Sequence, residues 1–391
     1  MDKAQRKAIL NQAFSPTQPI QEKDFFFGRM NQLMKVIEAI NEKGQHAILY
    51  GERGVGKTSL ANIMYKSYTN IYPVKITCDR RHTFRSLWED AFDKIQYSQT
   101  TSGIGFNAQN KSKMVSMKSL ISSYTDLKTN QIVDILNNLG NDYKLMFIFD
   151  EFDNIDDLNT KYFFADLIKS LSDNNINTTV ILVGIAESVE DLIGSHQSLE
   201  RCLKQVKMPR MKKEECEEII VNGLKLLDIK IDKSIQEKII EFSSGFPHYI
   251  HLLCKYGCLE LIENDKNYFS EPYLNIAINK GIENTSEQLR ITFRAAILSS
   301  SNNGKWKNIL YACANSELDE FNSFTISDIV KEYNKITQKA SNNSNLHYCI
   351  NELTKKNRAE ILTKLGKGRS SRYTFKNPMM RAFIKLKMNA K

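Results

Sequence analysis

Hydrophobic positions in the first half of the chain follow two alternating spacings. Short apolar runs, typical of buried strands, occur at 46–50, 72–78, 144–150 and 178–186, and a weaker one at 205–211. Between them, apolar residues recur every three or four positions over segments of roughly 10 to 15 residues, as on one face of a helix. This alternation predicts a parallel sheet with helices on both faces.

Residues 98–118, rich in Gly, Ser, Asn and Lys, interrupt this alternation and predict a loop or hairpin insertion. Its residues 103–106, Gly-Ile-Gly-Phe, would form either an exposed apolar tip for DNA or a partner, or part of a surface loop with a buried Phe106.

The pattern changes after Arg210, where strand signals stop and helical spacing predicts three helices, at 212–227, 234–244 and 247–263. From about residue 303, three helical segments precede two short strand segments joined by the turn 366–370, the order found in a winged helix. The predicted divisions are an extended N-terminal arm (1–24), an α/β core (25–210), a helical lid (211–285) and a winged-helix domain (286–391).

Composition is that of a soluble globular protein, with 41% hydrophobic and 25% charged residues among 391. No apolar run approaches the 18 or so residues that span a membrane, and the first residues do not resemble a secretory signal. The seven cysteines are odd in number and contain no CxxC pair. Reduced thiols and a cytoplasmic location, with no membrane partner, are therefore expected.

A phosphate-binding loop is the most specific motif in the sequence. Gly51 to Thr58, GERGVGKT, fits GxxxxGK[ST] between a predicted strand and a predicted helix. Glycines let backbone N–H groups surround phosphates, the helix N-terminus favours anions, and the lysine reaches the outer phosphates. The residues predicted to bind nucleotide here are Gly51, Gly54, Val55, Gly56, Lys57, Thr58 and Ser59.

Two acids follow the most apolar strand, at Asp150 and Glu151. A P-loop enzyme needs such a carboxylate, and Asp150 is predicted to hold Mg²⁺ together with Thr58. Glu151 is predicted to activate the attacking water, which makes it, with Lys57, a catalytic residue. The alternative is a pair of solvent-exposed acids at a strand end. The sequence thus predicts ATP and Mg²⁺ as cofactors of an ATPase.

With these motifs and Phe27-Gly28-Arg29 ahead of the P-loop, the chain resembles AAA+ ATPases, specifically the branch near origin-recognition-type initiators and the related STAND ATPases. Gly245-Phe246-Pro247 resembles the GxP of STAND proteins, and the resemblance covers roughly residues 20–260 and extends to the winged helix. It implies an α/β P-loop NTPase fold with an AAA+ parallel sheet, a helical lid and a winged-helix domain.

The resemblance also implies roles for four further residues. Arg29, Pro247 and His248 would contact nucleotide, and Arg201 would act as a catalytic arginine finger on a neighbouring subunit of a homo-oligomer. His248 stands where standard AAA+ members have arginine. Three of them have a plain alternative: a salt-bridge partner at a helix start for Arg29, and surface residues for Arg201 and His248.

Positive charge is concentrated at one end. Residues 355–391 hold 12 Lys or Arg and one acid, a net +11, whereas the other 354 residues hold 42 basic and 44 acidic side chains, a net −2. Such a local excess favours a polyanion, here double-stranded DNA along the predicted winged helix. The predicted contacts are Lys355, Lys356, Lys364, Lys367, Arg369 and Arg372. The alternative is a winged helix that docks a protein.

Three functions are consistent with these features. The leading one is an oligomeric ATPase that couples turnover to DNA binding, in a DNA transaction or in anti-phage defence. A second is a signalling scaffold that senses a trigger and activates a separate effector protein without binding DNA. A third is a transposition or replication regulator that loads onto DNA. Salt-sensitive DNA binding with ATP-dependent filaments would favour the third, and ATP binding without DNA affinity, together with a co-purifying partner, would favour the second.

Overall fold

We describe the protein from a computed structural model in which two compact units are distinguished: Pro19–Pro209, and Met1–Gln18 together with Arg210–Lys391. The chain therefore passes from one unit to the other at two places, between residues 18 and 19 and between residues 209 and 210. The described residues are 1–67, 70–101, 111–139, 144–194, 199–298, 303–338, 340–366 and 371–390.

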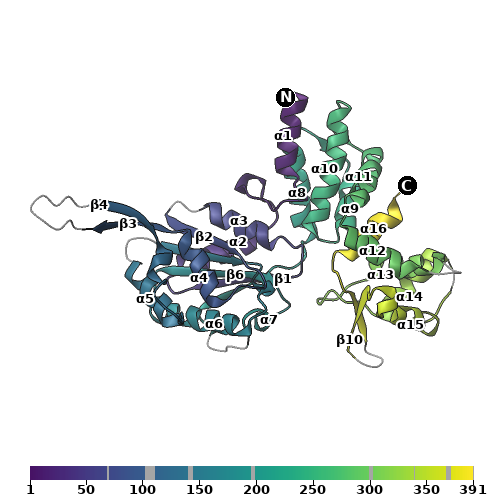
Figure 1. Cartoon of the computed structure of the whole chain (residues 1–391). Helices are drawn as coiled ribbons and strands as arrows, with labels where there is room; N and C mark the ends of the chain where they lie inside the picture. The colour runs from purple at the N-terminus through teal and green to yellow at the C-terminus, as the bar shows by residue number, and fades with distance from the viewer. Residues whose placement is uncertain are drawn as a thin grey trace, which may run out of the picture. The chain divides into compact units, whose positions relative to one another are not determined.

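The Pro19–Pro209 unit is built on a five-stranded parallel sheet of order β2-β5-β6-β1-β7, which confirms the predicted parallel sheet (Figure 1). Its strands are β1 (His46–Gly51), β2 (Ile71–Thr77), β5 (Lys144–Asp150), β6 (Thr178–Ile185) and β7 (Leu203–Lys207). β5, which lies between β2 and β6, is buried from its second residue onward, as its continuous apolar run predicts.

Helices cover both faces of this sheet, with α2 and α3 on one side and α5 and α6 on the other (Figure 1). The helices of the unit are α2 (Met30–Asn41), α3 (Lys57–Ser67), α4 (Phe84–Asp93), α5 (Thr129–Leu139), α6 (Leu158–Asp173) and α7 (Glu190–Ile193). Trp88 of α4 lies edge-on to Phe147 and Phe149 of β5, with ring centroids 4.9 and 5.7 Å apart. This aromatic cluster fixes α4 against the sheet.

A β-hairpin interrupts the alternation and begins two residues before the segment 98–118, where a loop or hairpin insertion is predicted. β3 (Gln96–Thr101) and β4 (Lys111–Ser116) pair antiparallel, with Gln96 opposite Ser116, and extend away from the sheet (Figure 1). The predicted apolar tip, residues 103–106, lies outside the described residues.

The N-terminal prediction is wrong in part, because the expected extended arm contains helix α1 (Lys3–Ala13). Asp2 accepts a hydrogen bond from the Gln5 backbone N–H, and the Gln5 side chain accepts one from the Asp2 N–H, which forms a capping box. After α1, Phe14 packs so closely on Gly223 that a Cβ there would lie 2.4 Å from its ring. Leu10, Ala13 and Phe14 are buried and follow helical spacing, a signal that the prediction of an extended arm overlooked.

The second unit continues with four helices where three are predicted. They are α8 (Lys213–Leu226), α9 (Lys233–Ser243), α10 (Pro247–Glu263) and the additional α11 (Glu271–Glu283). A two-stranded parallel ladder, β8 (Lys230–Ile231) and β9 (Tyr268–Phe269), joins the loops between them. α10 is the most buried of the four, and its apolar residues all round agree with that position.

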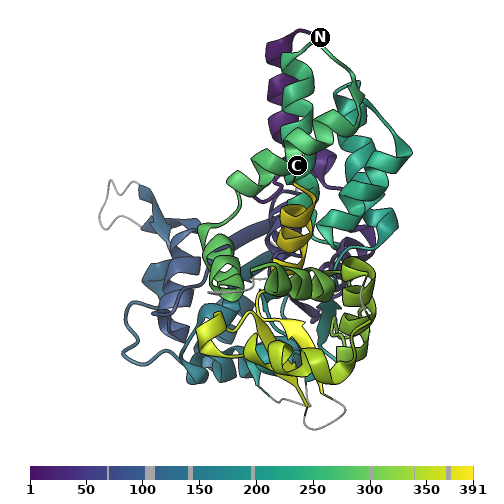
Figure 2. The same ribbon diagram turned by 90° about the vertical axis from the view of Figure 1, so that its right-hand side faces the viewer.

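The C-terminal part holds the predicted three helices and hairpin, seen at the front of Figure 2. Its elements are α12 (Glu287–Ile297), α13 (Asn303–Asn315), α14 (Ile326–Thr337), α15 (Asn343–Glu352), β10 (Leu362–Leu365), β11 (Arg372–Phe375) and α16 (Met380–Asn389). Helix α16 is not predicted from the sequence. It buries Phe383, Ile384 and Leu386, and also Arg381 and Lys385, whose charges obscure the apolar pattern.

Candidate nucleotide site

The P-loop runs from the end of β1 to the start of α3, at the carboxyl edge of the sheet. Gly51 has φ +150°, and a Cβ there would lie 2.3 Å from the Met208 carbonyl oxygen, so no larger residue fits beside the end of β7. Gly56 has φ +99°, a conformation that favours glycine. The glycines of the motif are thus required by the path of the backbone.

Lys57 lies folded back over this loop. Its Nζ donates to the carbonyl oxygens of Gly51 (2.9 Å) and Glu52 (2.8 Å), and its side chain is almost fully buried. Burial lowers the pKa of the Lys57 ammonium to about 8, against the opposing attraction of Asp153, Asp150 and Glu52. A cation with only carbonyl partners is suited to exchange them for phosphate oxygens.

Thr58 and Asp150 come together as predicted. The Thr58 hydroxyl lies 3.4 Å from Asp150 Oδ1, which also accepts a hydrogen bond from the Glu151 backbone N–H at 3.0 Å. Asp150 is 2% exposed. A hydroxyl and a carboxylate oxygen at the mouth of a P-loop are hard oxygen donors, and Mg²⁺ is usually held by one or two such groups with substrate phosphates. The donor set therefore fits Mg²⁺.

The second oxygen of Asp150 has a partner that the sequence analysis missed. Lys75 of β2 places its Nζ 2.9 Å from Asp150 Oδ2 and 2.5 Å from Asn62 Oδ1 on α3. The signal was available, because Lys75 is a lysine inside the apolar run 72–78. A charged residue there needs a buried countercharge.

Glu151 follows in a left-handed conformation, φ 57° and ψ 37°, which is uncommon for a residue with a side chain. Its exposed carboxylate accepts a hydrogen bond from the Asn154 amide at 3.1 Å. Asn154, three residues downstream, is a second residue that sequence reasoning missed. The predicted base is therefore solvent-accessible and held by a neutral donor.

Arg29 and Ser59 make hydrogen bonds that tie the P-loop and the start of α3 to neighbouring backbone. Arg29 is buried, and its Nη2 donates to the Val55 carbonyl at 3.1 Å and to the Pro209 carbonyl at 2.6 Å. Ser59 Oγ accepts a hydrogen bond from the Ile20 backbone N–H at 3.2 Å. Arg29 thus contacts the P-loop backbone, and its predicted contact with nucleotide stays a prediction.

Arg201 lies at the opposite edge of the sheet. Arg201 precedes β7, whose Leu203 is in register with His46 at the start of β1. The P-loop follows the other end of β1, and the two ends of that strand lie about 17 Å apart. The Arg201 guanidinium pairs with Asp173 at 2.9 Å and is largely exposed. Arg201 cannot reach its own P-loop, and a role on a neighbouring subunit stays a prediction.

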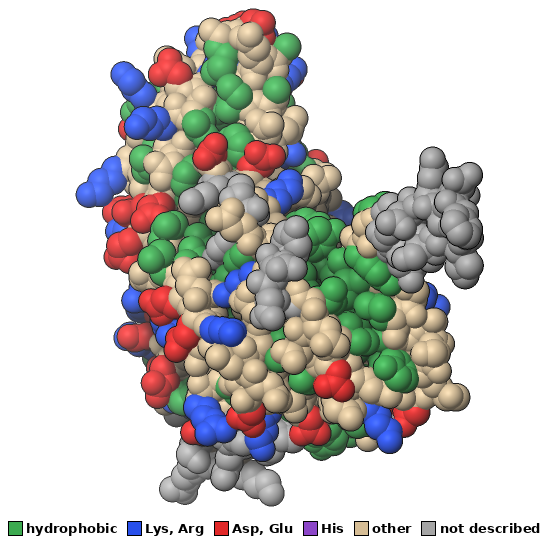
Figure 3. Space-filling view, turned by 90° about the vertical axis from the view of Figure 1, so that its left-hand side faces the viewer, with side chains coloured by type: hydrophobic (Ala, Val, Ile, Leu, Met, Phe, Trp, Pro, Cys, Tyr) green, Lys and Arg blue, Asp and Glu red, His purple; other side chains and the backbone are tan. Residues whose placement is uncertain are grey.

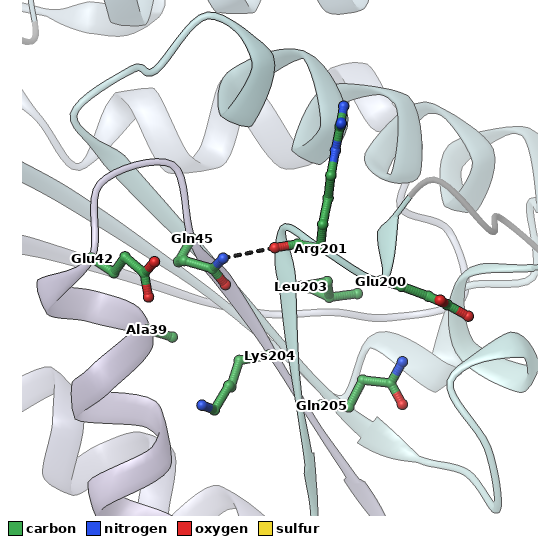
Figure 4. A pocket seen from close by; sticks show the side chains of 8 residues that line it. All are labelled: Ala39, Glu42, Gln45, Glu200, Arg201, Leu203, Lys204 and Gln205. Atoms are coloured by element: carbon green, nitrogen blue, oxygen red, sulfur yellow. Dashed lines mark hydrogen bonds between the residues drawn. The ribbon is translucent and has the colours of Figure 1, made fainter.

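The backbone at Arg201 borders an open hollow of about 330 Å³ (Figure 4). Gln45 Nε2 donates to the Arg201 carbonyl at 2.7 Å, and in Figure 4 the guanidinium points away from the Gln45 side chain. The hollow is lined by Ala39, Glu42, Gln45, Glu200, Arg201, Leu203, Lys204 and Gln205. Its acids and bases give it no predominant charge.

Pro247 and His248 begin α10 in the other unit. His248 Nδ1 lies 2.8 Å from the Pro16 carbonyl oxygen, so that nitrogen must carry the hydrogen. Burial lowers the pKa of His248, which leaves a neutral ring with only an acceptor at Nε2. In this state His248 offers no donor to a phosphate, and the predicted nucleotide contacts of both residues remain predictions.

Many of the basic side chains at the C-terminal end have partners within their own unit. Lys355 pairs with Glu352, and Arg372 pairs with Asp319 at 2.7 Å and donates to Ser323. Further basic residues of this segment with internal partners are Arg358 over the Trp306 ring, Lys376 with Glu360, Arg381 with the Ser316 carbonyl, and Lys385 with Glu241. The net charge thus overstates the surface free for DNA.

Lys356 and Lys364 remain available for a polyanion. Lys364 is an exposed residue of β10. Neither lysine makes an ion pair with another described residue. Lys367 and Arg369 lie outside the described residues. On the face shown in Figure 3, Lys and Arg are interspersed with Asp and Glu. Among the described residues, no helix is long and apolar enough to cross a membrane.

Comparisons with known proteins agree with this fold. The family model of Novel STAND NTPase 1 matches residues 13–264, more than half of the chain. A Walker-type ATPase of Pyrococcus abyssi superposes with a TM-score of 0.53 at 15% identity, over 95% of this chain and 99% of that chain. Identity this low shows the fold alone. A search of curated proteins found no match.

Two other solved structures are similar over nearly the whole chain. Cdc6p of Pyrobaculum aerophilum has a TM-score of 0.47 at 14% identity, covering 97% of this chain and 99% of that chain. The ORC1 protein of Aeropyrum pernix in complex with DNA has a TM-score of 0.45 at 14% identity, covering 97% and 96%. We draw no functional argument from similarity at this level.

Proposed function

The chain belongs to the Novel STAND NTPase 1 family, and we propose that it binds ATP with Mg²⁺ at its P-loop and hydrolyses it. The observation that carries the proposal is the meeting of Thr58 and Asp150 beside the glycine loop, with Glu151 directly after Asp150. This arrangement supports a cation site and a general base next to a site for phosphates.

Each residue has a separate task in the proposal. Lys57 exchanges its two carbonyl partners for the outer phosphates, and Thr58 and Asp150 hold the metal. Mg²⁺, when bound, neutralises charge on the phosphates. Glu151 accepts the proton of the attacking water, and its exposure gives that water access. Arg29 keeps the loop in shape through the Val55 carbonyl.

We further propose that the active form is a homo-oligomer. Arg201 is exposed and lies at the edge of the sheet opposite its own P-loop. A guanidinium so placed is accessible to the triphosphate of another copy, where it would stabilise negative charge. The pair with Asp173 is a surface pair and costs little to break.

Double-stranded DNA is the proposed partner of the C-terminal three helices and hairpin, as part of a DNA transaction or of anti-phage defence. Exposed Lys364 on β10 supports this proposal, together with Lys356. With two such contacts among the described residues, affinity would be modest and strongly dependent on salt. A partner that is a protein effector would instead be insensitive to DNA competitors.

The test is phosphate release from ATP by the full chain and by Glu151→Gln, with binding of a fluorescent ATP analogue measured in parallel. Glu151→Gln should bind the analogue like the wild type and lose turnover on the order of 100-fold. Glu190→Gln, an exposed glutamate on α7, is the matched control and should retain turnover. Wild-type turnover by Glu151→Gln would refute the role of Glu151, and no binding by the wild type would refute the whole proposal.

DNA binding is tested in the same assay with duplex DNA at low and high salt. Lys356→Ala/Lys364→Ala should lose any stimulation of turnover by DNA, while its turnover without DNA stays unchanged. If DNA neither binds nor alters turnover at low salt, the DNA proposal is refuted and the ATPase proposal stands.

A further inference from the structure

Among the described residues beside the nucleotide site, Lys75 is a charged and largely buried side chain to which the proposed function gives no task. It lies on β2 between Val74 and Ile76, which face the aromatic core, so its own side chain points to the opposite face, toward α3. It is in register with Ile148 on β5, two residues before Asp150. The register brings the ammonium to the carboxylate.

Three elements meet at this ammonium. Nζ lies 2.9 Å from Asp150 Oδ2 at the end of β5 and 2.5 Å from Asn62 Oδ1 on α3, and the side chain is only 16% exposed. An ammonium with three donors and two fixed oxygen partners has one preferred position. The Asn62 contact ties that position to the helix that also carries Thr58.

Asp150 is consequently held from both sides. Lys75 takes Oδ2, while the Glu151 N–H and the Thr58 hydroxyl approach Oδ1. The carboxylate cannot rotate without breaking the pair with Lys75, and a broken buried pair is costly. Oδ1 is therefore kept on the side of Thr58, where the proposed cation site lies.

We propose that Lys75 is a positioning residue for the metal site: it fixes the Asp150 carboxylate so that Oδ1 faces Thr58 and the incoming Mg²⁺–nucleotide. Groups that orient a metal-binding carboxylate from behind typically change metal affinity about 10- to 100-fold when they are removed. Lys75 contacts Oδ2, so it does not occupy the oxygen offered to the cation. This inference rests on the proposed nucleotide site.

The experiment measures binding of a fluorescent, non-hydrolysable ATP analogue to the full chain as Mg²⁺ is titrated, and again in EDTA. In Lys75→Met, the Mg²⁺ concentration that gives half of the metal-dependent gain in affinity should rise about tenfold. Affinity in EDTA should stay within about twofold of wild type, because Lys57 and the loop are unchanged. Lys75→Arg should restore most of the Mg²⁺ response.

Lys94→Met is the matched control. Lys94 donates to the Lys75 backbone carbonyl at 2.5 Å, whereas the Asp150 carboxylate pairs with the Lys75 side chain. The Mg²⁺ response of Lys94→Met should therefore equal that of wild type. Should Lys75→Met not fold, Asn62→Ala removes the second anchor of the ammonium and should raise the Mg²⁺ midpoint severalfold.

The outcomes separate this inference from the proposed function. A wild-type chain that binds no analogue would refute the proposed function. A wild type with a clear Mg²⁺ response, and Lys75→Met or Asn62→Ala with the same response, would refute the positioning role alone. A lower Mg²⁺ midpoint in Lys75→Met would also overturn it, since the lysine charge would then oppose the metal instead of preparing its site.

Discussion

Acid should destabilise the protein through histidines that fold in their neutral form. His46, at the start of β1, is fully buried, and its Nδ1 accepts a hydrogen bond from the Val180 backbone N–H at 3.0 Å. Burial, and to a lesser extent the nearby Lys144, lower the pKa of His46 to about 3. In the other unit, burial lowers the pKa of His251 to about 4.

The sign follows from proton binding by the two states. In the unfolded chain a histidine has a pKa near 6.5. Between about pH 6.5 and pH 4, His46 is therefore protonated in the unfolded state but stays neutral in the folded state. The stabilisation is present above pH 6.5 and is lost as the pH falls. At pH 5 the loss is about 2 kcal/mol for His46, since 1.5 pH units at 1.36 kcal/mol each are involved.

Two tryptophans allow the units to be monitored separately. Trp88 lies in the core of the Pro19–Pro209 unit and Trp306 on α13 of the other, so Trp306→Phe leaves fluorescence that reports on the unit containing His46. The assay is urea unfolding at pH 7.5 and pH 5.0, with and without His46→Asn, whose side-chain oxygen can still accept from Val180. His46→Asn should remove about 2 kcal/mol of the pH-dependent loss. An equal loss in both proteins would refute the reasoning.

Three further predictions follow from local geometry. Gly51→Ala should lower the free energy of unfolding by about 2 to 3 kcal/mol in urea, because its Cβ would lie 2.3 Å from the Met208 carbonyl oxygen; a change below about 0.5 kcal/mol would contradict this. Asn154→Ala should lower ATP turnover about tenfold with unchanged ATP affinity, since Glu151 loses its amide donor; unchanged turnover would show that this hydrogen bond is dispensable. Asp157→Ala should cost about 1 kcal/mol in thermal unfolding, because Asp157 caps α6; no loss would argue against the cap.

The sequence predicts the nucleotide-site elements well, because their physical signals are local. Buried strands in the α/β core are continuous apolar runs, and the P-loop requires glycines at fixed positions, as Gly51 and Gly56 illustrate. The strand ending at Asp150 and the helix carrying Thr58 could therefore be placed, and their meeting follows from the carboxyl edge that parallel strands share.

Features that depend on distant contacts could not be read in this way. Lys75 stands out as a charge in an apolar run, but its partners Asn62 and Asp150 follow only from the register of β2 on β5, which one sequence does not give. The apolar pattern of helix α16 is interrupted in the sequence by Arg381 and Lys385, two charged residues that are buried in the fold. Because several basic residues of 355–391 likewise have partners inside the unit, the net charge of that segment overstates the basic surface available to DNA.

The central claim is that the P-loop binds ATP with Mg²⁺, and calorimetric titration of ATP into the full chain tests it most directly. Wild type should bind one ATP per chain, more tightly with Mg²⁺ than in EDTA, and Lys57→Met should weaken binding at least about tenfold, because it removes the charge-assisted bonds to phosphate. If wild type releases no heat with ATP, or if Lys57→Met binds as tightly as wild type, the account of the site is wrong.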